Sequence, residues 1–180
     1  MVKSLYIGRF QPLHLGHMKA IEYAMSKVDE LIIIIGSAQA SHSLNNPFTA
    51  GERIMMLKEA LKEYQVEPSK YYLIPIPDAT MHSVWVSEII SYSPPFQDVY
   101  SNEALTSVLF REFGIKVKKI PFYQREVYSA TEVRRRILAE QNWRELLPQS
   151  VTKIIDEIGG IERLKELTMT DGSIKKHSID

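Results

Sequence analysis

The chain has 180 residues, and its 22 lysine and arginine residues balance 22 aspartate and glutamate residues, so the formal net charge is zero. A neutral chain has no general attraction for the phosphate backbone of DNA or RNA, and we therefore expect no nucleic-acid partner. Cysteine is absent, which excludes disulfides, thiolate metal sites and cysteine nucleophiles together.

The first predicted elements are a strand, a helix and a second strand. Ser4 to Gly8 is a short apolar run with aromatic and β-branched members, which is typical of a buried strand. Leu15 to Lys27 has the apolar spacing of a helix. The segment DELIIIIG, which ends at Gly36, predicts a central parallel strand that is apolar on both faces.

The longest continuous apolar run lies within that second strand, from Leu31 to Ile35. It is far shorter than the roughly 20 residues that a membrane span needs. The N-terminal segment carries Arg9 and two histidines where a signal peptide would need an unbroken apolar stretch. We therefore expect a soluble cytoplasmic protein with no membrane partner.

A capping box opens the next helix, because Thr49 and Glu52 stand three residues apart and each can satisfy a free backbone N–H. Tyr72 to Ile76 predicts a third strand, although Pro75 within it cannot donate a ladder hydrogen bond. The helix places four apolar or aromatic side chains at the spacing of a buried stripe, namely Ile54, Leu57, Leu61 and Tyr64.

The remaining chain continues the alternation of helices and strands. A second capping box, formed by Ser129 and Glu132, opens a helix that carries the arginines of the segment Arg134–Arg136. Gly159 and Gly160 separate the last two predicted helices. The predicted helices are His82–Tyr92, Glu103–Phe113, Gln149–Ile158 and Ile161–Leu167, and the predicted strands are Asp98–Ser101 and Lys116–Phe122.

This alternation predicts parallel βαβ units and hence a Rossmann-like, doubly wound α/β fold of about five strands, flanked by helices and followed by C-terminal helices. We expect a single domain over residues 1–168 and a frayed tail over residues 169–180. In such sheets ligands bind beyond the carboxyl ends of the strands. The eight glycines form neither GxGxxG nor the P-loop pattern, which disfavours an ordinary dehydrogenase and a P-loop kinase.

The first candidate site is the segment from Gly8 to His17, which leaves a strand and enters a helix. A helix start directs free N–H groups at a ligand, and glycine permits close approach of a phosphate. His14 and His17 can share one helix face and donate hydrogen bonds to phosphoryl oxygens. A metal site is the weaker alternative, because no neighbouring carboxylate or cysteine completes it. Either histidine alone would more often be structural.

The second candidate site is the helix start at Ser129, with Thr131 and Arg134 one turn further on. Two hydroxyls, free N–H groups and a guanidinium can hold a di- or triphosphate. Taken alone, the segment favours the other interpretation, a capped helix with a solvated basic face. Two helix starts suited to phosphate at one edge of a sheet indicate nucleotide chemistry.

The HxGH segment His14–His17 and the later SxTxxR pattern from Ser129 to Arg134 resemble the nucleotidylyltransferase superfamily. Within it, GRFQPLHLGH, GSAQASHSLNNPFTAGER and YSATEVRRR resemble the archaeal type of nicotinamide-nucleotide adenylyltransferase, in the same order from about Leu5 to Leu167. The resemblance implies that AMP is transferred from ATP to nicotinamide mononucleotide (NMN), which gives NAD and pyrophosphate. It also implies Mg²⁺, bound mainly through the ATP phosphates, and a homo-oligomer, often a hexamer in this family.

The resemblance also implies roles for individual residues. His14, His17 and Arg134 would be catalytic. Trp85 falls where the family places an aromatic residue against the nicotinamide ring, and Ser37 and Asp78 are assigned with it to the NMN side. The residues assigned to ATP are Gly8, Arg9, Phe10, Gly16, Asn102, Ser129 and Thr131.

Several alternatives stay open at this point. Trp85 among valines and isoleucine is commonly a core residue, and without the resemblance that interpretation would be favoured. Asn45 stands near a position where some family members carry a basic residue, and Arg53 fits packing or a salt bridge in its own helix. The acceptor could also be nicotinate mononucleotide, phosphopantetheine or FMN, and a regulator that binds ATP without turnover is the alternative of another class.

Overall fold

A computed structural model shows a five-stranded sheet with the order β3-β2-β1-β4-β5, in which every neighbouring pair is parallel. The structure describes residues 1–121, 124 and 126–174, and for residues 170–174 only the backbone. The predicted doubly wound α/β fold is confirmed. The strands are β1 (Lys3–Gly8), β2 (Glu30–Ile35), β3 (Tyr71–Pro75), β4 (Asp98–Tyr100) and β5 (Lys116–Lys118).

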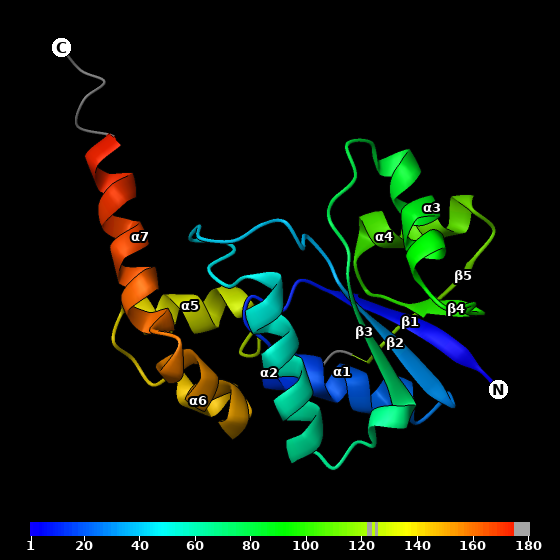
Figure 1. The fold of residues 1–180 in the computed structure, drawn as a ribbon, viewed down its shortest axis with the longest axis horizontal. Coiled ribbons are helices and arrows are strands. Elements are labelled where there is room, and N and C mark those ends of the chain that lie inside the picture. Colours follow the sequence, from blue (N-terminus) through cyan, green and yellow to red (C-terminus); the bar gives the residue numbers. More distant parts are fainter. Residues whose placement is uncertain (122–123, 125, 175–180) are drawn as a thin grey trace.

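Helices cover both faces of this sheet (Figure 1). One face carries α1 and α2, and the other carries α3 and α4, while the C-terminal helices pack beside α2. The helices are α1 (Leu15–Met25), α2 (Ala50–Glu63), α3 (His82–Tyr92), α4 (Ala104–Glu112), α5 (Ala130–Leu138), α6 (Gln149–Glu157) and α7 (Gly160–Ile174), with short 3-10 turns η1 (Pro68–Lys70) and η2 (Arg144–Leu146). Within the described residues, no helix is both long and apolar enough to cross a membrane.

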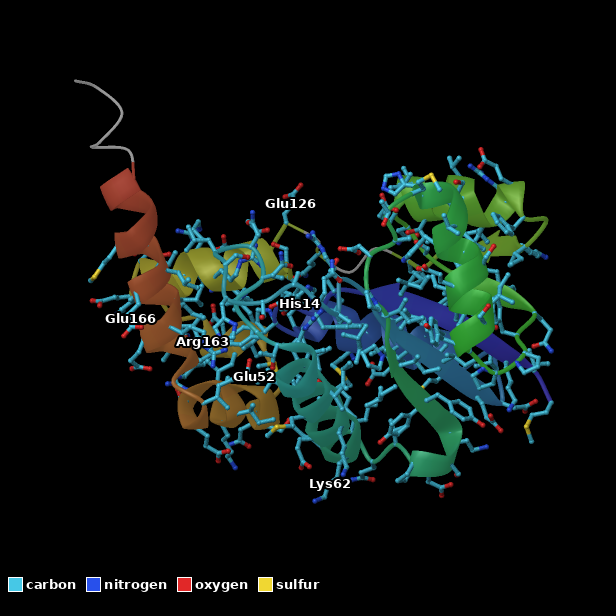
Figure 2. All side chains as sticks on the ribbon, turned by 45° about the horizontal axis from the view of Figure 1, so that its top comes forward. His14, Glu52, Lys62, Glu126, Arg163 and Glu166 are labelled. Carbon is cyan, nitrogen blue, oxygen red and sulfur yellow. The ribbon has the colours of Figure 1, made fainter. Side chains whose placement is uncertain are left out.

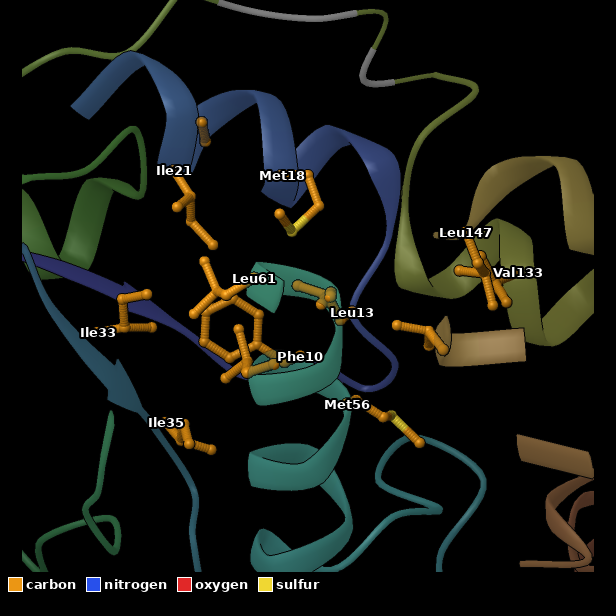
Figure 3. Packing of buried hydrophobic residues seen from close by; sticks show 14 of the residues in the cluster. Phe10, Leu13, Met18, Ile21, Ile33, Ile35, Met56, Leu61, Val133 and Leu147 are labelled. Carbon is orange, nitrogen blue, oxygen red and sulfur yellow. The ribbon is translucent and has the colours of Figure 1, made fainter. Parts of the chain in front are cut away.

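Strand β2 explains why both sheet faces are buried. Ile33 and Ile35 point into the cluster that contains α1 and α2, whereas Ile32 and Ile34 point into the cluster that contains α3 and α4. The isoleucine run is therefore apolar on both faces, as predicted, because side chains alternate along a strand. Figure 3 shows the larger cluster, in which side chains of β2, α1, α2 and the turn between β1 and α1 meet: Phe10, Leu13, Met18, Ile21, Ile33, Ile35, Met56 and Leu61.

All strand ends lie within one residue of the prediction except the end of β5. Strand β3 includes Pro75, which is tolerated because β3 is an edge strand of the sheet. Strand β5 ends at Lys118, so the predicted strand was too long; Lys119 to Pro121 belong to no strand, and Phe122 lies outside the described residues. Strand β5 is also an edge strand, and it pairs only along the three residues of β4.

The buried stripe of α2 is rotated from the predicted one. Leu57 and Leu61 are fully buried as predicted, but Ile54 and Tyr64 are only half-buried. The other buried positions are Arg53, Met56 and Ala60. Helix α2 packs against α6 as well as the sheet, and this second neighbour shifts its buried face.

The last helix is longer than its sequence pattern indicates. Helix α7 starts at Gly160 and continues to Ile174, whereas we predicted it to end at Leu167. Gly159 has φ 65°, which ends α6 in the left-handed region and lets a new helix start one residue later. Residues 175–180 of the predicted tail lie outside the described residues.

Candidate active site

A cavity of about 340 Å³ opens at the carboxyl ends of β1 and β4. These neighbouring strands are where the strand order reverses, since β1 leads to β2 and β3 on one side and β4 lies on the other. That is the point at which doubly wound sheets bind ligands. The predicted site residues that line this cavity are Arg9, Phe10, His14, Gly16, His17, Asn102, Ser129, Thr131 and Arg134.

The turn from β1 to α1 is shaped by Phe10. Its φ of 51° lies in the left-handed region, and its ring is buried 4.8 Å from the His17 ring, centroid to centroid. A Cβ added to Gly8 would lie 2.7 Å from the Phe10 ring, so glycine is needed here for close approach of this ring rather than for an unusual φ. Gly8 thus makes room for the Phe10 ring, and it does not line the cavity.

His14 and His17 cap the start of α1 for each other. The backbone N–H of His17 donates to His14 Nδ1 and the backbone N–H of His14 donates to His17 Nδ1, both at 3.3 Å. The two rings stack with their centroids 3.6 Å apart. Because each Nδ1 accepts a hydrogen bond, each neutral ring carries its proton on Nε2, which leaves that N–H as the free donor.

Both histidines are neutral in the free protein at physiological pH. Burial lowers the pKa of His14 to about 3. Burial also lowers the pKa of His17 well below its ordinary value, and the neighbouring His14 lowers it further. The pair therefore presents hydrogen-bond donors without a formal charge of its own, and Figure 2 shows His14 near the middle of the molecule.

Helix α5 supplies the opposite wall of the cavity. Ser129 Oγ accepts the backbone N–H of Glu132 and so caps the helix, as predicted. Arg134 donates to the carbonyl of Gln11 at 2.7 Å and to Thr131 Oγ1 at 3.5 Å, which ties α5 to the β1–α1 turn.

Arg9 and Arg134 bring two positive charges to the cavity. Burial lowers the pKa of Arg134, and the charge of Arg9 lowers it further, so the two guanidiniums are close enough to repel. Neither forms an ion pair within the described part of the chain. Two cations that repel each other beside a cavity are suited to an anion of high charge.

The second capping box is only half formed, so that prediction was wrong in part. Glu132 does not reach back to the N-cap, because Arg135 holds it at 2.7 Å and Arg136 at 2.8 Å. These two ion pairs hold the pKa of Glu132 at about 2. Arg135 and Arg136 do not line the cavity, and Arg136 also pairs with Glu145 at 2.6 Å.

Asn102 lines the cavity but uses its amide on the protein. Its Nδ2 donates to the Ile120 carbonyl at 2.7 Å, and its Oδ1 accepts the Ile120 N–H at 3.1 Å. The side chain therefore joins the ends of β4 and β5, where it shapes the wall that faces a ligand. Asn45 reaches the same cavity from the loop before α2.

The residues predicted for the NMN side lie apart from this cavity. Trp85 is half-buried on α3 and packs edge-on against Phe110 at 6.1 Å. Ser37 donates to Asp78 at 2.9 Å, and Gln39 donates to the same carboxylate at 3.0 Å. Ser37 and Asp78 thus meet each other beyond the ends of β2 and β3, and their role stays a prediction.

Two residues that shape the site were not among the site residues predicted from the sequence, which assigned Arg53 only to packing or a salt bridge in its own helix. The Gln11 amide donates to the Phe48 carbonyl at 2.7 Å and accepts the Phe48 N–H at 2.9 Å, which fixes the loop before α2 against the β1–α1 turn. Arg53 is completely buried, and its guanidinium donates to the carbonyls of Arg9, Gly36, Ser37 and Thr49. Gln11 lies inside the quoted motif, but no local pattern marks Arg53 as a core residue.

The described side chains that line the cavity do not form a metal site of their own. They are compatible with a metal ion that is bound mainly by the phosphates of a ligand. Among the described residues, no three histidine, cysteine, aspartate or glutamate side chains are grouped as metal ligands. The acidic residue that lines the cavity, Glu103, uses its carboxylate to accept backbone N–H groups of Leu105 and Thr106. A divalent ion here would be held chiefly by phosphate oxygens.

Comparisons with known proteins agree with this geometry. Residues 5–136 match the model of the cytidylyltransferase-like family. A protein of Methanolobus tindarius named nicotinamide-nucleotide adenylyltransferase is 50% identical over 171 residues, which cover 95% of this chain and 97% of the relative. A protein of the same name from Pyrococcus horikoshii is 48% identical over 176 residues, which cover 98% and 94%.

A solved structure shares the fold at lower identity. The bifunctional NMN adenylyltransferase/ADP ribose pyrophosphatase of Francisella tularensis, complexed with AMP and a manganese ion, superposes with a TM-score of 0.78 at 20% identity. The match covers 97% of this chain and 54% of that one, so this chain spans about half its length.

Proposed function

Because the chain belongs to the cytidylyltransferase-like family and, within it, to the nicotinamide-nucleotide adenylyltransferases, we propose that it transfers AMP from ATP to NMN and forms NAD and pyrophosphate. The resemblance read from the sequence motifs is confirmed by these relatives. The observation that carries the mechanism is the cavity in which the helix starts of α1 and α5 face each other with Arg9 and Arg134.

In the proposed reaction, an oxygen of the NMN phosphate attacks the α-phosphorus of ATP. The new P–O bond forms as the bond from the α-phosphorus to the bridging oxygen breaks, and pyrophosphate leaves with that oxygen. The attacking phosphate monoester is already ionised at neutral pH, so no side chain has to remove a proton. Catalysis then depends on alignment and on stabilising charge.

The chain's own groups are suited to these two tasks. His14 and His17 donate from Nε2 to phosphoryl oxygens of ATP, with rings held in place by the reciprocal cap. Ser129, Thr131 and Arg134 hold the β- and γ-phosphates, and Arg134 offsets the charge that builds up on the leaving pyrophosphate. Arg9 adds a second positive charge at the same phosphates.

A divalent metal ion completes this proposal, and we take it to be Mg²⁺. It would be held by the ATP phosphates, and the few acidic groups of the cavity support that mode of binding. When bound, it supplies charge neutralisation on the phosphate oxygens. We further propose that Trp85, Ser37 and Asp78 contribute to the NMN side, where Trp85 could attract the pyridinium cation. A homo-oligomer and a cytoplasmic location stay predictions.

Product formation tests this function. The protein is supplied with ATP, Mg²⁺ and one acceptor at a time (NMN, nicotinate mononucleotide or phosphopantetheine), and the products are separated by chromatography. We expect NAD as the dominant product, with one pyrophosphate released per NAD. Binding of ATP without turnover of any acceptor would instead indicate a regulator. If the protein uses only another acceptor, the assignment of Trp85 to the nicotinamide ring is wrong.

A further inference from the structure

We propose that the hydroxyl of Tyr6 binds the adenine ring of ATP by donating a hydrogen bond to a ring nitrogen, an inference that rests on the proposed function. Tyr6 lies in β1 and points toward the α1 face of the sheet, where its ring meets the Phe10 ring edge-on at 6.1 Å. It is 93% buried and lines the cavity together with Ala20 of α1.

The Tyr6 hydroxyl has no hydrogen-bond partner within the described residues. Burial alone raises the pKa of this phenol above its ordinary value, with no contribution from a neighbouring donor, acceptor or charge. The hydroxyl oxygen is nevertheless not completely enclosed by protein atoms. Buried tyrosine hydroxyls normally find a partner, so a hydroxyl that reaches a cavity without one is suited to a ligand.

The surroundings of Tyr6 select the base of the nucleotide over its phosphates. The cations of the lining, Arg9 and Arg134, belong to the β1–α1 turn and to α5, whereas Tyr6 pairs in the sheet with Tyr100, just before the lining residue Glu103. The apolar residues of the lining include Ala20, Ile120 and Pro121. Arg9 follows Tyr6 by three residues and lies just beyond the carboxyl end of β1, in the turn toward α1. A lining that combines these apolar side chains with the acidic Glu103 suits an uncharged heterocycle better than a phosphate, whose charge is matched by Arg9 and Arg134.

The raised pKa of the Tyr6 phenol keeps its proton available for a hydrogen bond. The phenol keeps its proton at every physiological pH, so it is always able to donate. The ring nitrogens of adenine accept and carry no proton. We assign this position to adenine and not to the nicotinamide ring, because the residues proposed for the NMN side, Trp85, Ser37 and Asp78, do not line the cavity.

Tyr6→Phe is the direct test, because it removes only the hydroxyl. We expect ATP to bind about 3- to 10-fold more weakly, which is the range of one hydrogen bond. Binding of inorganic pyrophosphate, which has no base, should change less than about 2-fold by the same reasoning. Calorimetric titration without NMN measures both. Tyr23→Phe is the matched control, since Tyr23 packs on the same cluster but does not line the cavity.

A series of ATP analogues identifies the acceptor. With 1-deaza-, 3-deaza- and 7-deaza-ATP, wild type and Tyr6→Phe should bind one analogue equally well, because that analogue lacks the nitrogen that the phenol contacts. Unchanged ATP affinity in Tyr6→Phe, equal weakening of ATP and pyrophosphate, or the same loss with all three analogues would overturn the inference. If wild type fails to make NAD at all, the proposed function fails; if wild type is active and Tyr6→Phe binds ATP unchanged, only this inference does.

Discussion

His14 and His17 show how single residues serve folding and chemistry together. Their Nδ1 atoms cap the first turn of α1, where most helices use a serine, threonine, aspartate or asparagine. The same hydrogen bonds place the remaining ring proton on Nε2, so the cap also fixes the tautomer that can donate to a phosphate. The cost of this arrangement is that both rings must stay neutral, which makes the fold sensitive to acid.

That sensitivity can be measured as a pH dependence of stability. The pKa of His14 is about 3 in the folded protein and about 6.5 when unfolded, so below pH 6.5 the unfolded state binds the proton first. Stability is therefore fully present above pH 6.5 and falls as the pH drops toward 3. One such histidine costs about 2 kcal/mol between pH 6.5 and 5, or roughly 4–8 °C in melting temperature.

His14→Asn provides the comparison for this prediction. Asparagine caps a helix well but does not titrate in this range. We expect the melting temperature of the variant to depend less on pH between 6.5 and 5 than that of the wild type, as followed by circular dichroism. The same slope in both proteins would contradict the assignment. Burial also lowers the pKa of His17, so this residue contributes a pH dependence of stability in the same direction in both proteins.

Neighbouring arginines of α5 give a second comparison at the residue scale. Arg134 lines the cavity, whereas Arg135 points away and pairs with Glu132. Removing a group that stabilises transition-state charge typically lowers kcat by about 10²–10³. We expect that loss in Arg134→Ala and a change below about 2-fold in Arg135→Ala, since an exposed ion pair contributes roughly 0–1 kcal/mol. Steady-state NAD formation measures both, and equal losses would contradict this reading of the site.

At the scale of elements, the first turns of α1 and α2 each contain a glycine, but the space available for a side chain differs between them. Gly16 and Gly51 each occupy the second position of their helix. A Cβ on Gly16 would lie 3.0 Å from His14 Nδ1 and 3.0 Å from the Cβ of Tyr128. A Cβ on Gly51 would meet only Thr49 Oγ1, at 3.9 Å.

Alanine at these two positions should therefore have opposite effects. Gly16→Ala displaces the His14 ring, and we expect kcat/KM to fall more than about 10-fold and stability to fall by about 1–3 kcal/mol through overpacking. Gly51→Ala should keep activity and stabilise the protein by roughly 0.5–1 kcal/mol, because alanine loses less entropy than glycine in a helix. Urea unfolding and NAD formation test both; a fully active Gly16→Ala would show that the close approach is not required.

At the scale of the whole molecule, Arg53 joins parts of the chain that are distant in sequence. From α2 it donates to carbonyls at the ends of β1 and β2 and to the N-cap of its own helix, at 2.8–3.2 Å. Burial lowers its pKa, and Asp78 partly opposes this. A second long-range link joins α7 to α2, since Arg163 donates two hydrogen bonds of 2.8 Å to the Glu52 carboxylate. Both side chains are labelled in Figure 2.

Replacing Arg53 should destabilise the fold. Arg53→Met keeps most of the volume but leaves buried carbonyls without donors, and we expect a loss of about 3–5 kcal/mol and roughly 6–20 °C in melting temperature. Arg53→Lys should restore only part of this, because one ammonium cannot reproduce the planar guanidinium fork. Lys165→Ala, which breaks an exposed ion pair with Glu140, is the control and should cost no more than about 1 kcal/mol. Equal melting temperatures of wild type and Arg53→Met would contradict the assigned role.

The sequence by itself determined much of the fold and the part of the site that is assigned to ATP. The order of strands and helices, the isoleucine strand and the Thr49 cap depend on patterns within a few residues, because periodicity and capping act over one or two turns. The motif HxGH and the pattern from Ser129 to Arg134 could be assigned to one cavity because parallel strands bring their carboxyl ends to one edge. The structure places both segments there.

Only the tertiary structure decided the features that depend on distant partners. Arg134 meets Gln11 across 123 residues, Asn102 meets Ile120 across 18, and Arg53 becomes a core residue because two strand ends present their carbonyls to it. The end of β5 depends on the short strand beside it, and the buried face of α2 depends on α6. A buried polar group must satisfy its hydrogen bonds with whatever the fold places nearby, and no local pattern records which carbonyls those will be.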